Sequence, residues 1–563
     1  MASTAHVSPS MAKMPELEGD AHDSELDPQD DTPRDRYSQS QDEDRDRGRD
    51  LENTLSRVSS GPPYTVFSPG MKRWIVGMNC VAAFMSPTTA NIYFPALPTL
   101  ARDLGVGLDQ INITLTTYMI LQALAPTIFG DFGDFAGRRP AFIIAFVIYL
   151  GANIGLALQR NYAALLVLRM LQSGGSSGTI ALVYAVVADI APSSERGKWM
   201  GIVSSGITIG PAVGPVIGRP NLDIPGGLLN AYLGWPWIFW FLIILTTVWL
   251  IPYILAVPET ARKVVGNGSI PPQGWNMTLI DYLRFRKQNV TRPESSKKRE
   301  VLIPNPLNTL KVLRHKDMAM ILFYNASLFV AFSTVTATLA TQFQQIYGYD
   351  ELTLGLLYLP IGGSTTIASI GGGFIADWNF RRIARKLGVK VDRKRGNDMA
   401  KFPVEKARIQ LIFPLIFVGT GATIGYGWAL ERQTSVAVPL VLSFFIGLCV
   451  TWPFQILNLL IVDSYPEAPA TATAANNLVR CLSGAAATAS IEPIIRGIGR
   501  GWAFTLLALV FTIPSPVLWI IVNHGPRWRR QRTESMMQEA EKKKVETSEG
   551  QVLPREDNEP NIK

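Results

Sequence analysis

Long apolar runs alternate with short polar stretches between residues 74 and 523 of the chain. An α-helix rises 1.5 Å per residue, so about 20 residues cross a hydrocarbon core roughly 30 Å thick. The runs cover residues 74–98, 110–132, 140–158, 162–190, 197–218, 235–257, 318–344, 352–376, 407–430, 436–462, 471–495 and 501–523. Their number and length predict an all-α membrane protein with twelve transmembrane helices.

A polar stretch at residues 258–317 divides these runs six and six. We therefore expect two pseudo-symmetric six-helix bundles, at residues 71–257 and 318–525, joined by a basic central loop. Residues 1–70 are rich in Asp, Ser, Arg and Pro, and such a segment cannot bury enough apolar surface to offset its ordering entropy. This predicts a disordered acidic tail, either regulatory or simply solvated, and residues 526–563 form a second polar tail.

The composition agrees with a membrane protein. Charged residues make up 17% of the chain and hydrophobic residues 47%, whereas a soluble protein carries about 25% charged residues. This excludes a soluble enzyme, a nucleic-acid-binding protein and a disordered scaffold as the main body of the chain. The three cysteines and four histidines are scattered, so their spacing indicates neither a disulfide framework nor a metal site.

The net charge of +8 combines two opposed parts. Residues 1–70 hold 15 acidic and 7 basic residues, a balance of −8, so the remaining residues carry +16. Residues 258–317 hold 12 Lys or Arg and residues 377–406 hold 10, whereas the alternate loops carry only scattered arginines such as Arg160 and Arg432. Because cytoplasmic loops carry the excess of Lys and Arg, we expect both termini in the cytoplasm.

A short pattern, G-x3-D-x3-R-R, occurs once in each predicted bundle. Its members are Gly130, Asp134, Arg138 and Arg139 in the first bundle and Gly373, Asp377, Arg381 and Arg382 in the second. Both copies follow the second span of their half, 243 residues apart. Parallel repeats related by an axis along the membrane normal are a known transporter plan, in which two halves rock about a central cavity.

The repeated carboxylate has a clear chemical use. Asp134 lies at a helix end, where it can pair with the following arginines or cap the N-terminus of another helix. Gly130 lets its helix approach a neighbour, and Gly137 and Asp189 belong to the same cytoplasmic rim. We therefore predict a latch that holds the cytoplasmic side closed and breaks when it opens. The alternative is an ordinary positively charged loop.

Six stretches together carry a family resemblance. They are "NIYFPALPTL" (91–100), "GDFGDFAGRRP" (130–140), "RMLQSGGSSG" (169–178), "GITIGPAVGPVIG" (206–218), "DWNFRR" (377–382) and "ATAANNLVRC" (472–481). They resemble the major facilitator superfamily, its twelve-span drug:proton antiporters and, within these, the fungal quinidine-resistance and citrate-exporter branch. Ser173 and Pro215 stand where the family's fourth-span and fifth-span motifs have glycine.

The resemblance implies a secondary active transporter that exports drugs or secondary metabolites across the plasma membrane by alternating access, with protons as the coupling ion. An exporter of a small carboxylic acid such as citrate is the alternative, and a transporter-like receptor or sensor is a more remote one. The expected partners are a small-molecule substrate, protons and the lipid bilayer, with a monomeric chain and no nucleic acid. No phosphate-binding loop and no nucleophile–base or metal constellation is present, so we expect no enzyme activity, cofactor or metal.

Two arginines lie within predicted spans, where a charge costs about 2.5–3.5 kcal/mol on insertion scales and is a functional candidate. Arg169 is the arginine of the fourth-span motif, which the resemblance links to proton coupling. Because it is a permanent cation, it cannot itself release a proton. It can instead bind an anionic substrate, modulate a nearby acid, or form a structural hydrogen bond to helix carbonyls. Arg480 follows Asn476 and Asn477 and shares a helix face with Asn476. We expect that face to meet the cavity, unless Arg480 extends to the cytoplasmic interface.

The remaining site candidates are uncharged. Gln172, Gln455, Asn458 and Tyr118 are polar or aromatic residues within spans that can contact a substrate or take part in proton coupling. No carboxylate lies in the middle of a span, so the sequence does not identify the residue that carries the proton.

The fifth span carries a packing motif. Its members are Gly206, Gly210, Pro211, Gly214 and Pro215. Glycines at every fourth position give a smooth face for close helix approach, and the prolines bend the span. The next residues, 219–225, interrupt the family pattern, which indicates either an extended outer loop or a gene-model error.

Overall fold

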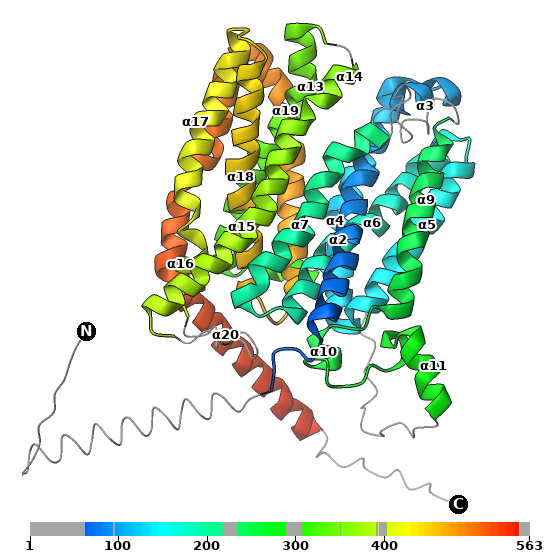
Figure 1. Ribbon diagram of the computed structural model, residues 1–563, viewed down its shortest axis with the longest axis vertical. Coiled ribbons are helices and arrows are strands. Elements are labelled where there is room, and N and C mark those ends of the chain that lie inside the picture. The colour runs from blue at the N-terminus through cyan, green and yellow to red at the C-terminus, as the bar shows by residue number, and fades with distance from the viewer. Residues whose placement is uncertain are drawn as a thin grey trace, which may run out of the picture. The chain divides into compact units, whose positions relative to one another are not determined.

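The computed structural model describes residues 62–93, 96–217, 234–288, 307–349, 351–389, 392 and 402–550. The chain divides into two units, Met1–Pro62 and Pro63–Lys563, and all the described helices belong to the second. Every regular element within these described ranges is helical (Figure 1). The predicted all-α fold class is confirmed.

The helices of the first bundle are α2 (Pro69–Asn91), α3 (Leu97–Leu104), α4 (Leu108–Ala136), α5 (Arg138–Leu158), α6 (Tyr162–Ile190), α7 (Ser193–Ile217) and α9 (Pro236–Ala256). The central segment holds α10 (Arg262–Val265), η2 (Gly274–Asn276), α11 (Leu279–Gln288) and α12 (Leu307–Val312). The second bundle contains α13 (Lys316–Tyr347), α14 (Glu351–Leu356), α15 (Tyr358–Lys386), α16 (Val404–Ile409), α17 (Ile412–Glu431), α18 (Ala437–Ser464), α19 (Pro469–Thr512) and α20 (Pro516–Gly550).

All twelve predicted apolar runs fall on helices, but not one to one. Within the described ranges, nine stretches are long and apolar enough to cross a membrane. One of them, Pro469–Ser535, covers two predicted runs, because α19 continues through a kink at Gly499, whose φ is 83°. The helices α2 and α7 cover the first and fifth runs but are not among these nine stretches. The count of twelve spans therefore stays a prediction.

Local sequence signals explain where several helices begin and end. The hydroxyl of Ser68 accepts a hydrogen bond from the backbone N–H of Met71 and caps α2 just before Pro69. Asn161 caps α6 in the same way, and Gly348, at φ 67°, ends α13 in the left-handed conformation that glycine adopts readily. At these three positions a cap residue therefore sets the limit of the helix.

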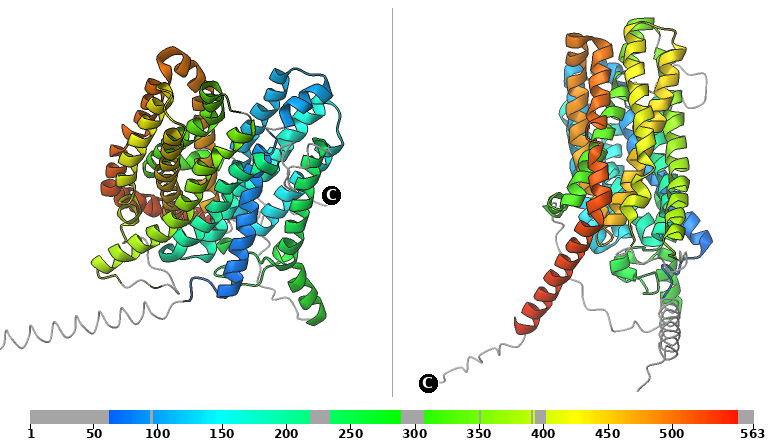
Figure 2. Two further views of the ribbon diagram at one scale, coloured as in Figure 1. Left: turned by 45° about the horizontal axis from the view of Figure 1, so that its top comes forward. Right: turned by 90° about the vertical axis from the view of Figure 1, so that its left-hand side faces the viewer.

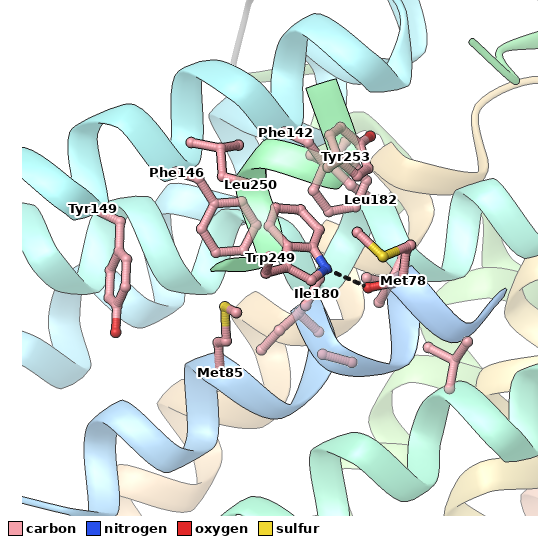
Figure 3. Packing of buried hydrophobic residues seen from close by; sticks show 14 of the residues in the cluster. Met78, Met85, Phe142, Phe146, Tyr149, Ile180, Leu182, Trp249, Leu250 and Tyr253 are labelled. Carbon is pink, nitrogen blue, oxygen red and sulfur yellow. Dashed lines mark hydrogen bonds between the residues drawn. The ribbon is translucent and has the colours of Figure 1, made fainter. Parts of the chain in front are cut away.

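Each bundle has its own apolar core. In the first, Trp249 of α9 donates its indole N–H to the carbonyl of Met78 on α2 at 2.8 Å. Its ring lies 4.4 Å from that of Phe146 on α5 and 4.7 Å from that of Tyr253 (Figure 3). Buried aromatic pairs of this kind each add about 0.5–1.5 kcal/mol beyond area burial. The aromatic cluster therefore fixes α2, α5 and α9 as one unit.

The two bundles meet along a few helices. Helix α7 packs on α15, and α4 and α6 pack on α19. Figure 2 shows the two bundles from two further sides. Asp134 and Asp377 both lie at one end of these contacts, which we call the latch end. Residues 219–225, the predicted insertion, lie outside the described residues.

Candidate transport site and latch

Asp134 joins the end of α4 to the start of α19. Its carboxylate accepts hydrogen bonds from the backbone N–H and the hydroxyl of Thr471, each at 2.8 Å. It also pairs with Arg138 at 2.6 Å, and Arg138 in turn donates to Asp189 at 2.9 Å. A carboxylate at a helix N-terminus is stabilised by the helix dipole and the free N–H groups there. Asp134 therefore acts both as a cap and as an ion-pair partner.

Asp377 makes the reciprocal contact from the second bundle. Its carboxylate accepts from the backbone N–H groups of Gly197 at 2.9 Å and Lys198 at 2.8 Å, near the start of α7. Arg408 donates to the same carboxylate at 3.3 Å. Each bundle thus supplies one buried aspartate that binds the beginning of a helix in the other bundle.

The second copy of the motif uses a different arginine. Arg138 pairs with Asp134 in the first bundle, but Arg381 bonds the carbonyl of Ser194 at 3.4 Å and Arg382 lies over the Trp378 ring at 5.5 Å. The arginine on Asp377 is Arg408, which comes from α16. The pairing that the spacing suggests for Arg381 and Arg382 therefore does not form.

Further latch contacts were not identified from the sequence. Arg196 of α7 pairs with Asp463 at the end of α18, and Arg408 binds the same aspartate at 3.0 Å. The sequence gives no signal for these pairs, because their members lie on α7, α16 and α18 and are far apart in the chain. Glu259 was also missed. It accepts from the backbone N–H groups of Arg138 at 2.9 Å and Arg139 at 3.0 Å and so caps α5.

A second, peripheral ion-pair layer ties α20 to the latch end. Arg529 lies 3.2 Å from Glu405, and Arg532 pairs with Asp317. Burial raises the pKa of Glu405, although the Arg529 guanidinium acts in the opposite direction. The beginning of the predicted C-terminal tail is therefore helical and bonded to the second bundle.

Tyr64 lies in the stretch that the sequence predicts to be a disordered tail. Its hydroxyl donates to the carbonyl of Ala188 at 2.7 Å and accepts from Arg196 at 3.0 Å. The Arg262 guanidinium covers its ring at 3.6 Å and donates to its carbonyl at 2.8 Å. The last residues before α2 therefore contact the arginine that pairs with Asp463.

Glycines permit the close contacts at the latch end. A Cβ on Gly130 would lie 2.9 Å from the carbonyl oxygen of Ala470, and one on Gly373 would overlap the backbone of Gly197. Gly137 has a φ of 118° and is enclosed by Glu259. A larger residue at Gly130 or Gly373 would have to move a helix, and one at Gly137 would be strained by the positive φ.

The fifth-span motif packs one face of α7 on α2. A Cβ on Gly206 would meet Cys80, and one on Gly210 would lie 2.9 Å from Pro87. Pro211 is exposed, and Gly214 and Pro215 follow in the same helix. Within this motif, Gly206 and Gly210 are therefore the residues that allow α7 to approach α2 closely.

Arg169 lies inside the first bundle and is 0% exposed. Its guanidinium lies 4.0 Å from the Tyr93 ring centre and 4.3 Å from the Tyr118 ring centre. One nitrogen donates to Gln172 at 2.6 Å, and Gln172 donates to Asn153 at 2.7 Å. The other two nitrogens have no hydrogen-bond partner among the described residues. Arg169 is thus held by aromatic rings rather than by a carboxylate.

Amides from three helices form a network in the second bundle. Asn325 of α13 donates to Asn458 at 2.9 Å and to Asn476 at 2.8 Å, and Asn476 donates to Asn458 at 2.8 Å. Gln455 joins Asn458 to Ser369 through bonds of 3.3 Å each. Asn325 was missed because a lone amide in an apolar run gives no signal of its own.

Arg480 has a different amide partner from the one that helix spacing suggests. Two of its nitrogens donate to the side-chain oxygen of Asn477, at 3.1 and 2.6 Å, while Asn476 joins the amide network. Asn477 itself donates to the carbonyl of Gln122 on α4 at 2.8 Å. The structure therefore places Arg169 and Arg480 in separate clusters.

A family model for the Major Facilitator Superfamily matches residues 80–488, which is more than half of the chain. The chain belongs to the major facilitator superfamily. This superfamily consists of multi-pass membrane transporters and not of enzymes, so the chain is a membrane transporter. The resemblance predicted from the motifs is confirmed at this level.

Individual relatives agree with the fungal branch. MFS-type transporter phiD from Fungal sp. (strain ATCC 74256) is 46% identical over 84% of this chain and 71% of its own length. Citrate exporter 1 from Aspergillus niger is 35% identical over 85% of this chain and 91% of its own. The solved structure of the proton:xylose symporter XylE covers 81% of this chain and 97% of its own, with a TM-score of 0.58 at 13% identity, and shows the fold alone.

Proposed function

We propose that this transporter exports small organic molecules, such as drugs or secondary metabolites, across the plasma membrane by alternating access in exchange for protons. The observation that carries the proposal is the reciprocal latch, in which Asp134 binds the start of α19 and Asp377 binds the start of α7. A hydrogen bond to a charged group contributes about 1.5–3 kcal/mol. The latch is therefore strong enough to hold one end closed and weak enough to break in each cycle.

The side of the membrane on which the latch lies is indicated by the charge of the neighbouring sequence. The two segments rich in Lys and Arg, residues 258–317 and 377–406, begin in the sequence next to Glu259 and at Asp377 of the latch end, which supports a cytoplasmic location for it and for both termini. In this orientation the latch closes the inner side when the cavity faces outward, and the export direction itself rests on the family resemblance and on a relative named as a citrate exporter.

The export assay uses cells that express the chain and are loaded with a fluorescent drug. We expect efflux that falls at least tenfold when a protonophore collapses the pH gradient. The Asp134→Asn/Asp377→Asn double variant should lose efflux as well. Glu492→Gln, a matched carboxylate change on a surface ion pair, should keep it. Efflux that is unaffected by the protonophore would contradict proton exchange.

A second candidate function is export of a small carboxylic acid. Arg169 and Arg480 both lie within spans, and neither forms an ion pair with a carboxylate in the described part of the chain. A relative at 35% identity is named as a citrate exporter. Citrate efflux that Arg480→Ala abolishes would support this function, whereas unchanged citrate levels together with gained drug resistance would contradict it.

A further inference from the structure

Only one of the two arginines within spans is accessible to a ligand. Arg169 is 0% exposed and lies between the rings of Tyr93 and Tyr118, so an anion can reach it only if those rings move. Arg480 is half-buried, and among the described residues its guanidinium bonds the uncharged side chains of Asn477 and Cys481 and no carboxylate. Of these two arginines, Arg480 is therefore the one that an anionic ligand can reach.

Arg480 faces the boundary between the two bundles rather than lipid. Its partner Asn477 bonds the α4 backbone at Gln122, across that boundary. The guanidinium is also close enough to Tyr184 of α6, a buried residue of the first bundle, to interact with it electrostatically. A position between halves that rock apart is where a transporter of this plan holds its substrate.

Two phenyl rings flank the Arg480 guanidinium. The ring centres of Phe329 on α13 and Phe454 on α18 lie 5.0 and 5.9 Å from it, and 5.9 Å from each other. Both phenylalanines are half-buried, so part of each ring is open to contact. The site thus combines one accessible cation with an apolar surface that prefers flat, conjugated groups.

We propose that Arg480, Phe329 and Phe454 bind an amphipathic organic acid, with one carboxylate on the guanidinium and an apolar, preferably aromatic, body against the two rings. This rests on the proposed function, because it names the substrate class of that transporter. A compact polycarboxylate such as citrate fits less well, since its additional charges would lie against phenyl rings with no second cation to pair them.

The test measures binding to the purified full-length chain in nanodiscs, without a pH gradient. The probes are 2-naphthoate, its uncharged analogue 2-naphthamide, and citrate. We expect 2-naphthoate to bind at least tenfold more tightly than either of the others. Arg480→Gln should lower 2-naphthoate affinity to that of the amide, and Phe454→Leu should weaken both naphthalene compounds about threefold. Arg496→Gln, an exposed arginine outside this site, should change nothing.

Several outcomes would overturn the assignment. These are failure of 2-naphthoate to bind the wild-type chain, tighter binding of citrate than of 2-naphthoate, or unchanged 2-naphthoate affinity in a folded Arg480→Gln variant. The comparison of the three probes on the wild-type chain tests the preference for an amphipathic acid even where a variant does not fold. Because binding needs no gradient, loss of export with intact binding would count against the proposed function and not against this site.

Discussion

At the scale of single residues, buried arginines have distinct roles that depend on their partners. Arg138, Arg196 and Arg408 each bind aspartates at the latch end, whereas Arg169 is enclosed by two tyrosine rings. The sequence identified Arg169 as a candidate site residue because a charge within an apolar run is conspicuous. The role of Arg408 could not be predicted in this way, because Arg408 lies at the edge of a run and its partner Asp377 is on another helix.

Arg169→Lys should lower export at least tenfold while leaving the chain folded. A planar guanidinium can stack between Tyr93 and Tyr118 and still donate to Gln172, but a compact ammonium cannot do both. Tyr118→Phe keeps the ring and loses only hydroxyl contacts of 3.4–3.5 Å, so its export should stay close to that of the wild type. Equal export by Arg169→Lys and wild type in the drug-efflux assay would show that the stacking is dispensable.

Tyr64 gives a second prediction at this scale. Tyr64→Phe removes the hydroxyl that joins Arg196 to the carbonyl of Ala188, which should cost about 0.5–1.5 kcal/mol of stability. Tyr64→Ala should cost more, because the ring under Arg262 is lost as well. Thermal unfolding of the purified chain measures both changes, and identical melting of all three proteins would mean that this contact contributes nothing.

At the scale of helices, the apolar pattern predicted where the helices lie but not the contacts of the polar segments beside them. Each run falls on a helix, because a run of this length must form its backbone hydrogen bonds internally when it lies in a bilayer. The kink at Gly499 lies in the break that the sequence predicted between the runs 471–495 and 501–523, although hydropathy does not record its backbone conformation. The bonded segment around Tyr64 was missed, because composition alone cannot show that a few residues of a polar tail find partners.

The glycines of α7 provide the prediction at this scale. Gly210→Ala should destabilise the chain by about 1–3 kcal/mol, because its methyl group would lie 2.9 Å from Pro87 and force α7 away from α2. Gly151→Ala in α5 is the matched control, since nothing lies within 4 Å of a Cβ there. Thermal unfolding in detergent should separate the two variants, and equal melting temperatures would contradict the packing of α7 on α2.

At the scale of the whole molecule, the two halves are joined by a symmetric device. The spacing around Asp134 and Asp377 predicted a latch with a copy in each bundle, and both carboxylates do bind the start of a helix in the opposite bundle. The amide network around Asn325 was less visible, because its members come from α13, α18 and α19 and meet only in three dimensions. Repeated motifs can be detected in a sequence, whereas contacts between distant uncharged residues cannot.

The account depends most on the claim that these two aspartates hold the latch end closed. Spin labels at Lys263 and Arg382, which are exposed residues of the two halves near that end, allow their separation to be measured by double electron–electron resonance. Replacing each aspartate by asparagine should weaken each side of the latch by about 1.5–3 kcal/mol, and 1.4 kcal/mol changes a population ratio tenfold. The account predicts one short distance in the wild type and in Glu492→Gln, and a longer distance that dominates in Asp134→Asn/Asp377→Asn. An unchanged short distance in the folded double variant would contradict it.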